Sequence, residues 1–263
     1  MSRIKEVFQN VKSKDKKALI TYITVGDPHI SVSREIIRQL IENGADILEL
    51  GVPFSDPTAD GPVIQAASQR ALKTGINLTD ILALVKEIRQ VSQIPLILFS
   101  YYNPLFVVGA QEITQRAKKA GVDGLLVVDL PYEEADELKK YTDQADLDLI
   151  FLLAPTSNDA RIKMISQKAR GFLYYISMTG VTGSTLSEGQ YIEKDIRRIK
   201  KYTDLPIAIG FGISTPEQAQ AMGKFADGVV VGSAIVRLIE ENRNSPQLLK
   251  KVGEFIAQLR RVL

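Results

Sequence analysis

The feature that most constrains the fold is the regular alternation of short apolar runs with longer amphipathic segments. Eight runs rich in Val, Ile and Leu recur along the 263 residues, at 18–25, 46–52, 96–101, 124–129, 148–154, 172–177, 207–212 and 228–234. The runs are continuously apolar, which is typical of strands in a parallel sheet whose outer face is covered by helices. The sequence therefore predicts eight parallel β-strands separated by helices.

The segments between the runs carry the start and stop signals of helices. In "PVIQAASQRALKTG" (62–75), Pro62 lies near the first turn and Gly75 follows the last, the positions that these residues favour. The segment "RIKEVFQNVKS" (3–13) predicts an extra helix before the first strand. Eight β/α units without a linker in a chain of this length predict an α/β fold, a single (β/α)8 TIM barrel domain over residues 1–263 with an extra N-terminal helix.

The alternative is a doubly wound open sheet, which predicts one dominant glycine-rich turn after the first strand. That position holds "TVGDPH", and the glycines gather after the later strands, so the barrel is favoured. Weak similarity among "GADILELG", "GVDGLLVV" and "FADGVVVG" indicates a repeated Gly-x-Asp turn from helix into strand. We expect this turn on the barrel floor in a structural role, because barrel enzymes work at the opposite end, where strands run into the βα loops.

Composition excludes several classes of function. Lys and Arg number 33 against 31 Asp and Glu, spread along the chain with a net charge of +2, so we expect no nucleic-acid partner and no membrane surface. No apolar stretch approaches the roughly 20 residues of a bilayer span, and the charged N-terminus does not resemble a signal peptide. We expect a cytoplasmic protein, or a stromal one if the chain comes from a plastid. The lack of Cys and the single His, His29, exclude a thiol nucleophile, a disulfide scaffold and a thiolate or His-rich metal site, and we expect no metal.

Three carboxylates gather in "LELGVPFSDPTADGP" (48–62), with Glu49 at the end of an apolar strand and Asp56 and Asp60 in the loop that follows. A carboxylate among apolar neighbours costs several kcal/mol unless it is paired or neutral. Glu49 is therefore either a catalytic acid or an interior carboxylate satisfied by a neighbouring hydroxyl or Lys. Asp56 and Asp60 are otherwise ordinary turn residues, and Asp60 is placed to cap the helix that begins near Pro62. Taken together, Glu49 and a loop carboxylate give two acids in different surroundings, which is how one site holds a proton donor beside an ionised base.

Three glycine-rich turns follow the last three predicted strands. They are "GVTGS" (180–184), "GFGIS" (210–214) and "GSA" (232–234), the last of which opens a helix. Converging backbone N–H groups and a helix N-terminus bind a dianion without Lys or Arg, and barrels place phosphate sites after strands seven and eight. The long polar segment 177–191 is either a lid that orders over a substrate or a plain exposed loop.

Aromatic and acidic residues lie near other strand ends. Tyr22, Phe99, Tyr174 and Phe211 are placed to enclose a flat apolar group, although packing in the core is the default role of such side chains. Asp129, in "VVDLPYEEA", is placed to cap the helix after its strand, and we expect its role to be mainly structural or one of contact with a substrate.

The motifs "LELGVPFSDPTADGPVIQAASQRAL", "GDP", "YYNP", "DLP", "LAPTS", "GVTG", "GFGIS" and "VGSAIV" occur in this order along the whole chain. In this respect the sequence resembles the alpha subunit of tryptophan synthase. The resemblance implies a (β/α)8 barrel that cleaves indole-3-glycerol phosphate to indole and glyceraldehyde 3-phosphate. It also implies no cofactor on this chain, because pyridoxal phosphate belongs to the beta subunit that receives the indole, in an alpha2beta2 heterotetramer.

The resemblance assigns roles to the matching positions. Glu49 and Asp60 match the family's catalytic pair. The positions around the phosphate are Gly183, Gly212, Gly232 and Ser233, with Thr182 in the lid. The positions that line the indole pocket are Tyr22, Phe99, Tyr174 and Phe211. The positions on the face that meets the beta subunit are Pro53, Phe54, Asp56, Asn103 and Pro131.

Two positions depart from well-known members of the family. Tyr22 stands where Phe is common, and "SMTG", with Met178 and Thr179, stands where many members have an Arg in the lid. Neither removes a group that the reaction needs. In that reaction, an apolar strand end raises the pKa of Glu49, which gives a proton to indole C3 and then takes one from the chain hydroxyl. Asp60, more solvated in its loop, stays ionised and hydrogen-bonds the indole N–H.

Two other functions are compatible with parts of the pattern. A barrel enzyme for another phosphorylated substrate, such as a sugar-phosphate isomerase, explains the glycine turns but not the paired acids among aromatic residues. A non-catalytic partner of a beta-like subunit explains the predicted docking face and requires no turnover. Indole release from indole-3-glycerol phosphate distinguishes these functions from the cleavage reaction.

Overall fold

The computed structural model describes residues 2–176, 186–210 and 212–263. Its eight parallel strands pair in chain order and close into a barrel, in which β8 also pairs with β1. The strands are β1 (Ala18–Thr24), β2 (Ile47–Gly51), β3 (Leu96–Ser100), β4 (Gly124–Val127), β5 (Asp148–Leu153), β6 (Leu173–Ile176), β7 (Ile207–Gly210) and β8 (Gly228–Val231). All eight predicted strands are present, and barrel closure confirms the predicted fold over the open sheet.

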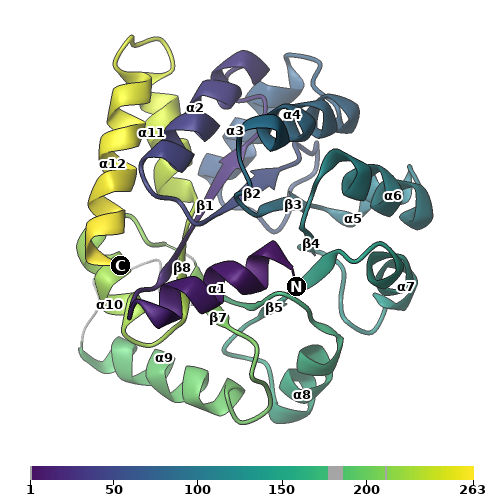
Figure 1. The fold of residues 1–263 in the computed structure, drawn as a ribbon, viewed down its shortest axis with the longest axis vertical. Helices are drawn as coiled ribbons and strands as arrows, with labels where there is room; N and C mark the ends of the chain where they lie inside the picture. The colour runs from purple at the N-terminus through teal and green to yellow at the C-terminus, as the bar shows by residue number, and fades with distance from the viewer. Residues whose placement is uncertain (1, 177–185, 211) are drawn as a thin grey trace.

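Helices surround the barrel (Figure 1). Those that the structure describes are α1 (Arg3–Ser13), α2 (Ile30–Glu42), α3 (Pro62–Leu72), α4 (Leu78–Val91), α5 (Tyr102–Phe106), α6 (Ala110–Ala120), α7 (Asp136–Gln144), α8 (Asp159–Lys168), α9 (Leu186–Ile199), α10 (Pro216–Gly223), α11 (Ser233–Asn242) and α12 (Leu248–Val262). The predicted extra helix is α1, which Figure 1 shows lying across the middle of the ring of helices. The helix predicted at 62–75 is α3, with Pro62 at its first position.

The extra helix closes the amino-terminal end of the barrel. The Ser2 hydroxyl caps α1 by accepting a hydrogen bond from the Lys5 N–H at 3.3 Å, a common way to satisfy the first N–H groups of a helix. Ile4 and Phe8 then join the apolar cluster that fills the barrel interior. The ring centroid of Phe8 lies 5.6 Å from that of Phe172. We call this closed end the floor and the opposite end, at the carboxyl ends of the strands, the mouth.

The register of β1 and β2 brings the functional candidates to the mouth. Ile20 pairs with Ile47, and both belong to the interior cluster. Side chains of a strand alternate between its two faces, so Tyr22 and Glu49, which pair two residues further on, also face the barrel axis. The alternation thus places a tyrosine beside a glutamate near the top of the interior.

The Gly-x-Asp turns lie on the floor, as predicted. The carboxylate of Asp46 accepts a hydrogen bond from Leu19 N at 2.7 Å, and Asp123 accepts one from Leu96 N at 2.8 Å. The third of these turns repeats the arrangement with Asp227, which accepts from the first N–H of β7 at 3.0 Å. Each aspartate thus satisfies the backbone at the start of the strand preceding its own, which confirms the structural role.

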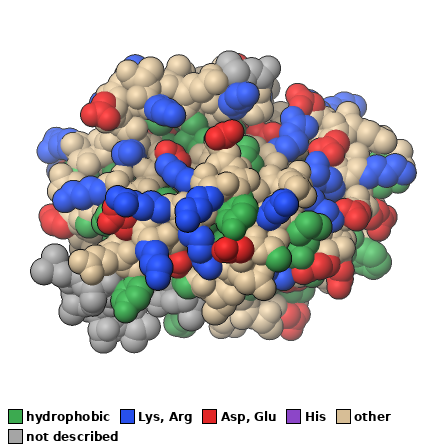
Figure 2. All heavy atoms as spheres, turned by 90° about the horizontal axis from the view of Figure 1, so that it is seen from below, with side chains coloured by type: hydrophobic (Ala, Val, Ile, Leu, Met, Phe, Trp, Pro, Cys, Tyr) green, Lys and Arg blue, Asp and Glu red, His purple; other side chains and the backbone are tan. Residues whose placement is uncertain are grey.

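The outer surface mixes charges of both signs. Figure 2 shows the side that carries α8 and α9, where Lys and Arg side chains alternate with Asp and Glu and the apolar side chains are scattered. In the part of the chain that the structure describes, none of the helices has the length and apolarity needed to cross a bilayer.

Candidate active site

A cavity of about 350 Å³ lies at the mouth and gathers most of the predicted site residues. Its lining includes the two acids, three aromatic side chains and three residues of the glycine-rich turns: Glu49, Asp60, Tyr22, Phe99, Tyr174, Gly212, Gly232 and Ser233. These residues come from β1, β2, β3 and β6 and from the turns after β2, β7 and β8. The cavity therefore unites acids, aromatic walls and candidate phosphate turns that are distant in sequence.

Glu49 is buried without a partner. It is 1% exposed, and among the described residues neither carboxyl oxygen has a hydrogen-bond partner. Burial raises its pKa to about 8, because the charged form loses its hydration. No hydroxyl or Lys of the described residues thus satisfies Glu49, which favours the catalytic alternative. Tyr22, its neighbour in register, directs its hydroxyl to Thr24 Oγ1 at 3.2 Å instead.

Asp60 is half-buried and does have a partner. The Tyr101 hydroxyl donates to Asp60 Oδ2 at 3.1 Å and accepts from Ala59 N at 2.9 Å. Burial raises the pKa of Asp60 to about 6, against the opposing effect of the Tyr101 hydrogen bond. The N-cap of α3 is Gly61, with no side-chain cap, so the capping role considered for Asp60 is wrong. Tyr101 was not among the predicted site residues, although "FSYYNP" places it directly after the third strand.

The cavity walls are aromatic. The rings of Tyr22 and Phe99 meet edge to face, with centroids 5.0 Å apart at 72°, a favourable geometry for aromatic pairs. The tyrosine hydroxyls lie over glycines of the neighbouring strands, since a Cβ on Gly51 would overlap the Tyr22 hydroxyl and one on Gly210 would overlap that of Tyr174. The predicted fourth wall residue, Phe211, lies outside the described residues.

The candidate phosphate turns come from β7 and β8. Gly212 has a φ of 74°, a conformation that favours glycine. Gly232 is the N-cap of α11 and has no side-chain cap, so the first N–H groups of this helix are available to an anion. Gly183 and Thr182 lie outside the described residues, as does the segment 177–185 of the predicted lid.

Arg237 is a lining residue that sequence reasoning missed. It follows Ser233 by four residues on α11 and lines the same cavity. Helical spacing is the signal that points to it, because residues four apart lie on the same face of a helix.

Comparison with known proteins assigns the family. A family model described as "Tryptophan synthase alpha chain" matches residues 8–262. The chain belongs to the tryptophan synthase alpha chain family. It is 50% identical over 260 residues to a tryptophan synthase alpha chain of Geotalea uraniireducens, covering 99% of this chain and 97% of that one. It is 47% identical over 263 residues to a tryptophan synthase alpha chain of Geobacter sulfurreducens, covering 100% of this chain and 99% of that one. The crystal structure of tryptophan synthase subunit alpha from Legionella pneumophila str. Paris has a TM-score of 0.93 at 39% identity, with coverage of 100% of this chain and 98% of that one.

The positions expected to meet a beta subunit lie in the loops after β2 and β4 and in α5, which follows β3. The Phe54 ring packs on Tyr101 with centroids 5.2 Å apart. Asp56 and Asn103 are exposed, whereas Pro131 is half-buried and Pro53 is buried. Two further apolar side chains at the end of α5 are largely exposed, Phe106 at 62% and Val107 at 78%.

Asp129 serves a different helix from the one considered. Its Oδ1 accepts a hydrogen bond from Tyr102 N at 2.7 Å, so it caps α5, which follows β3, and not the helix after its own strand. The physical reason is that β3 and β4 are paired neighbours in the barrel. The residue that follows β4 therefore lies beside the start of the helix that follows β3. This contact agrees with the structural one of the two roles expected for Asp129.

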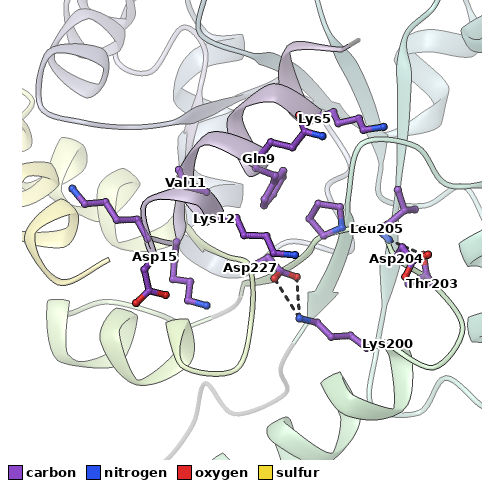
Figure 3. A pocket seen from close by; sticks show the side chains of 14 residues that line it. Lys5, Gln9, Val11, Lys12, Asp15, Lys200, Thr203, Asp204, Leu205 and Asp227 are labelled. Atoms are coloured by element: carbon purple, nitrogen blue, oxygen red, sulfur yellow. Dashed lines mark hydrogen bonds and ion pairs between the residues drawn. The ribbon is translucent and has the colours of Figure 1, made fainter.

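A larger cavity, of about 440 Å³, lies at the floor between α1 and the loops that lead into β7 and β8 (Figure 3). Lys5 and Lys12 of α1 line it opposite Lys200, which forms an ion pair with Asp227. No group of three or more His, Asp or Glu side chains that could hold a metal ion occurs among the described residues. The floor cavity is thus lined by exposed lysines and shares no lining residue with the mouth.

Proposed function

We propose that this chain catalyses the alpha reaction of tryptophan synthase, the cleavage of indole-3-glycerol phosphate to indole and glyceraldehyde 3-phosphate. The observation that carries the proposal is the unpartnered Glu49 carboxyl in the same cavity as Asp60 and the glycine-rich turns of β7 and β8. This combination supplies a proton, an ionised carboxylate and an anion cradle around one apolar pocket. The family membership supports the same conclusion.

Glu49 is the proton carrier in this mechanism. With a pKa of about 8, about nine in ten molecules hold the proton at pH 7. Glu49 gives this proton to indole C3, which forms an indolenine. The resulting carboxylate then takes the proton of the hydroxyl on the adjacent chain carbon. The C3–carbon bond breaks, its electron pair returns to the ring, and the chain carbon becomes the aldehyde of glyceraldehyde 3-phosphate.

Asp60 stabilises the charge that develops on the ring. Its pKa of about 6 leaves it mostly ionised at pH 7, so it accepts a hydrogen bond from the indole N–H as the nitrogen becomes electron-poor. The Tyr101 hydroxyl holds one of its two oxygens. The expected order of the two acids, with Glu49 protonated and Asp60 ionised, agrees with the two pKa values.

The phosphate binds at the part of the cavity wall that the turns after β7 and β8 form. The dianion accepts hydrogen bonds from the backbone N–H groups at Gly232 and Ser233, at the positive end of α11. The turn at Gly212 lies beside it, and Arg237 adds a positive charge. We include Gly183 and the Thr182 lid in this site from the family resemblance. No cofactor enters the cleavage reaction.

The family implies a beta-subunit partner. We propose that it docks on Pro53, Phe54, Asp56, Asn103 and Pro131, and that the complex is an alpha2beta2 tetramer. The exposed Phe106 and Val107 lie on α5 beside Asn103 and extend this face. Exposed apolar side chains in a group are typical of interaction surfaces.

The test is indole release from indole-3-glycerol phosphate by the isolated chain, with and without a beta subunit. We expect slow release alone and faster release in the complex. An isolated chain without turnover that still binds a beta subunit would support the non-catalytic alternative. Turnover of a sugar phosphate without indole release would support the isomerase alternative.

A further inference from the structure

Two helices, α3 and α11, follow the strands on either side of β1, namely β2 and β8, and they pack against each other. The loop that carries Asp60, residues 52–61, leads into α3, and the turn at Gly232 leads into α11. Ala67 of α3 and Val236 of α11 form one buried cluster with Tyr22 of the cavity wall. Asp60 lies just before α3 and the phosphate turn directly precedes α11. The packing of these two helices therefore influences the distance between Asp60 and the phosphate turn.

Arg70 of α3 joins three segments at the far end of this pair. Its Nε and Nη2 donate to the two carboxylate oxygens of Asp27, both at 2.8 Å, and its Nη1 donates to Glu240 Oε1 of α11 at 2.6 Å. Asp27, in the loop after β1, is 2% exposed, and the Arg70 side chain is 18% exposed. Charge-assisted, bidentate hydrogen bonds of this kind fix geometry more firmly than a single neutral bond.

The contacts between α3 and α11 advance along both helices in the same direction. Ala67 of α3 packs with Val236 of α11, and one turn further on Arg70 of α3 pairs with Glu240 of α11. At about 1.5 Å per residue, Arg70 lies about 12 Å from the start of α3, and Glu240 about 10 Å from the start of α11. The ion pairs thus hold both helices at nearly the same distance from the cavity, so a shift at this end is transmitted to Asp60 and to the phosphate turn.

We propose that Arg70 is a positioning residue that fixes the separation between the Asp60 loop and the phosphate turn of α11, an inference that rests on the proposed function. The substrate has its indole at one of these groups and its phosphate at the other. A fixed separation lets both ends bind at once, which aligns the bond to be broken with Glu49. Asp27 anchors Arg70 to the barrel, and Glu240 transfers the constraint to α11.

Glu240 is the side chain to change, because removal of Arg70 would leave Asp27 buried without its partner and threaten folding. Glu240 is 35% exposed at its side chain, so Glu240→Ala releases α11 and leaves the Arg70–Asp27 pair intact. In Glu240→Gln, the amide oxygen still accepts from Arg70 Nη1. The pair of variants thus separates loss of the contact from loss of the charge.

Two measurements report on the two functions of the cavity. Titration with inorganic phosphate measures the turn at α11 without any reaction, and steady-state kinetics gives kcat and KM for indole-3-glycerol phosphate. We expect Glu240→Ala to weaken phosphate binding and raise KM, each about fivefold, with kcat within about twofold of the parent. Glu240→Gln should restore most of both affinities.

Asp46→Asn provides the matched control. Asp46 pairs with Arg260 on the floor, and that arginine is also 18% exposed. We expect this variant to lower Tm and to leave phosphate affinity, KM and kcat unchanged. Parent-like phosphate affinity and KM in Glu240→Ala would overturn the inference, as would equal changes in Asp46→Asn. If the parent releases no indole, the proposed function fails, whereas the phosphate titration still tests the constraint on α11.

Discussion

The two ends of the barrel treat buried carboxylates in opposite ways. On the floor, Asp123 is buried and accepts hydrogen bonds from Arg89 at 2.5 Å, Arg3 at 2.8 Å and Leu96 N at 2.8 Å. At the mouth, Glu49 is even more deeply buried, yet it has no partner among the described residues. Burial alone therefore does not mark a catalytic acid in this fold. Glu49 differs because no donor among the described residues compensates for its burial, so it keeps its proton near neutral pH, and for this reason we propose it as the acid.

The largest expected effect comes from replacing the unpartnered acid. Glu49→Gln keeps the shape of the side chain and removes the proton that the reaction uses. We expect kcat for indole release to fall by about 10³-fold or more, about 4 kcal/mol, with phosphate affinity unchanged. A variant that retains most of the parental rate would show that Glu49 is not the acid.

The same variant also tests the stability side of the contrast. The pKa of Glu49 is raised from 4.5 to about 8, so the folded chain keeps a proton that the unfolded chain releases. The parent should therefore lose stability as pH rises from about 4.5 to about 8, by up to roughly 1.4 kcal/mol per unit. Glu49→Gln should lack this loss in denaturant titrations, which would make it the more stable chain at pH 8.

Replacing Asp123, the paired acid on the floor, should lower stability and leave activity unchanged, the reverse of the effects expected for Glu49→Gln. Asp123→Ala leaves Arg89, which is 11% exposed at its side chain, without its carboxylate. Breaking a buried pair from one side costs about 3 kcal/mol or more, so the free energy of unfolding should fall by that amount. Where the variant folds, KM and kcat should equal those of the parent. A lower kcat in the folded variant would contradict the division of labour between floor and mouth.

Asp60 should be intermediate, since it is only half-buried and has one partner. Asp60→Asn keeps an acceptor for the Tyr101 hydroxyl but loses the charge that faces the indole N–H. We expect kcat to fall by about 100-fold, equivalent to about 2.7 kcal/mol, with little change in Tm. Equal kcat in the variant and the parent would remove Asp60 from the mechanism.

The pH profile should show both acids together. Activity needs Asp60 ionised and Glu49 protonated, so kcat/KM should fall below about pH 6 and above about pH 8, tenfold per unit or about 1.4 kcal/mol. Asp60→Asn should abolish the acidic limb in whatever activity remains. A profile flat from pH 5 to pH 9 would contradict the assignment of these groups.

The smallest effect should come from the Tyr22 hydroxyl. Its partner is Thr24, at 3.2 Å, and not either acid. Tyr22→Phe keeps the ring against Phe99 and removes one neutral hydrogen bond, which is worth about 1 kcal/mol. We expect Tm to fall slightly and kcat/KM to stay within about twofold of the parent. A loss approaching that of Asp60→Asn would give this hydroxyl a direct part in the reaction.

Much of the fold was predictable because a short run of apolar residues marks each strand in the sequence. The site was predictable where polar groups interrupt those runs, as Glu49 does, or where glycines gather, as at Gly232. The cap on the following helix that was considered for Asp129 is wrong, because its partner, Tyr102 N, lies on a neighbouring unit of the barrel. Closure of the barrel brings strand ends together in a way that spacing along the chain does not reveal.

The contacts that orient the site were the least predictable. Arg70 meets Asp27 and Glu240 across 43 and 170 residues of sequence, and no local pattern marks such a triad. Tyr101 looks like a strand-end aromatic until the loop of Asp60 folds back onto it. The residues proposed to act on the substrate have local signatures in the sequence, whereas the residues proposed to hold them in place are defined by the tertiary structure.

The N-terminal helix across the floor has a consequence for the way in which indole leaves the cavity. Ile4 and Phe8 fill the lower end of the barrel interior, so the described residues leave indole no path along the axis toward the floor. We therefore expect indole to leave at the mouth, which lies beside the face proposed to meet the beta subunit.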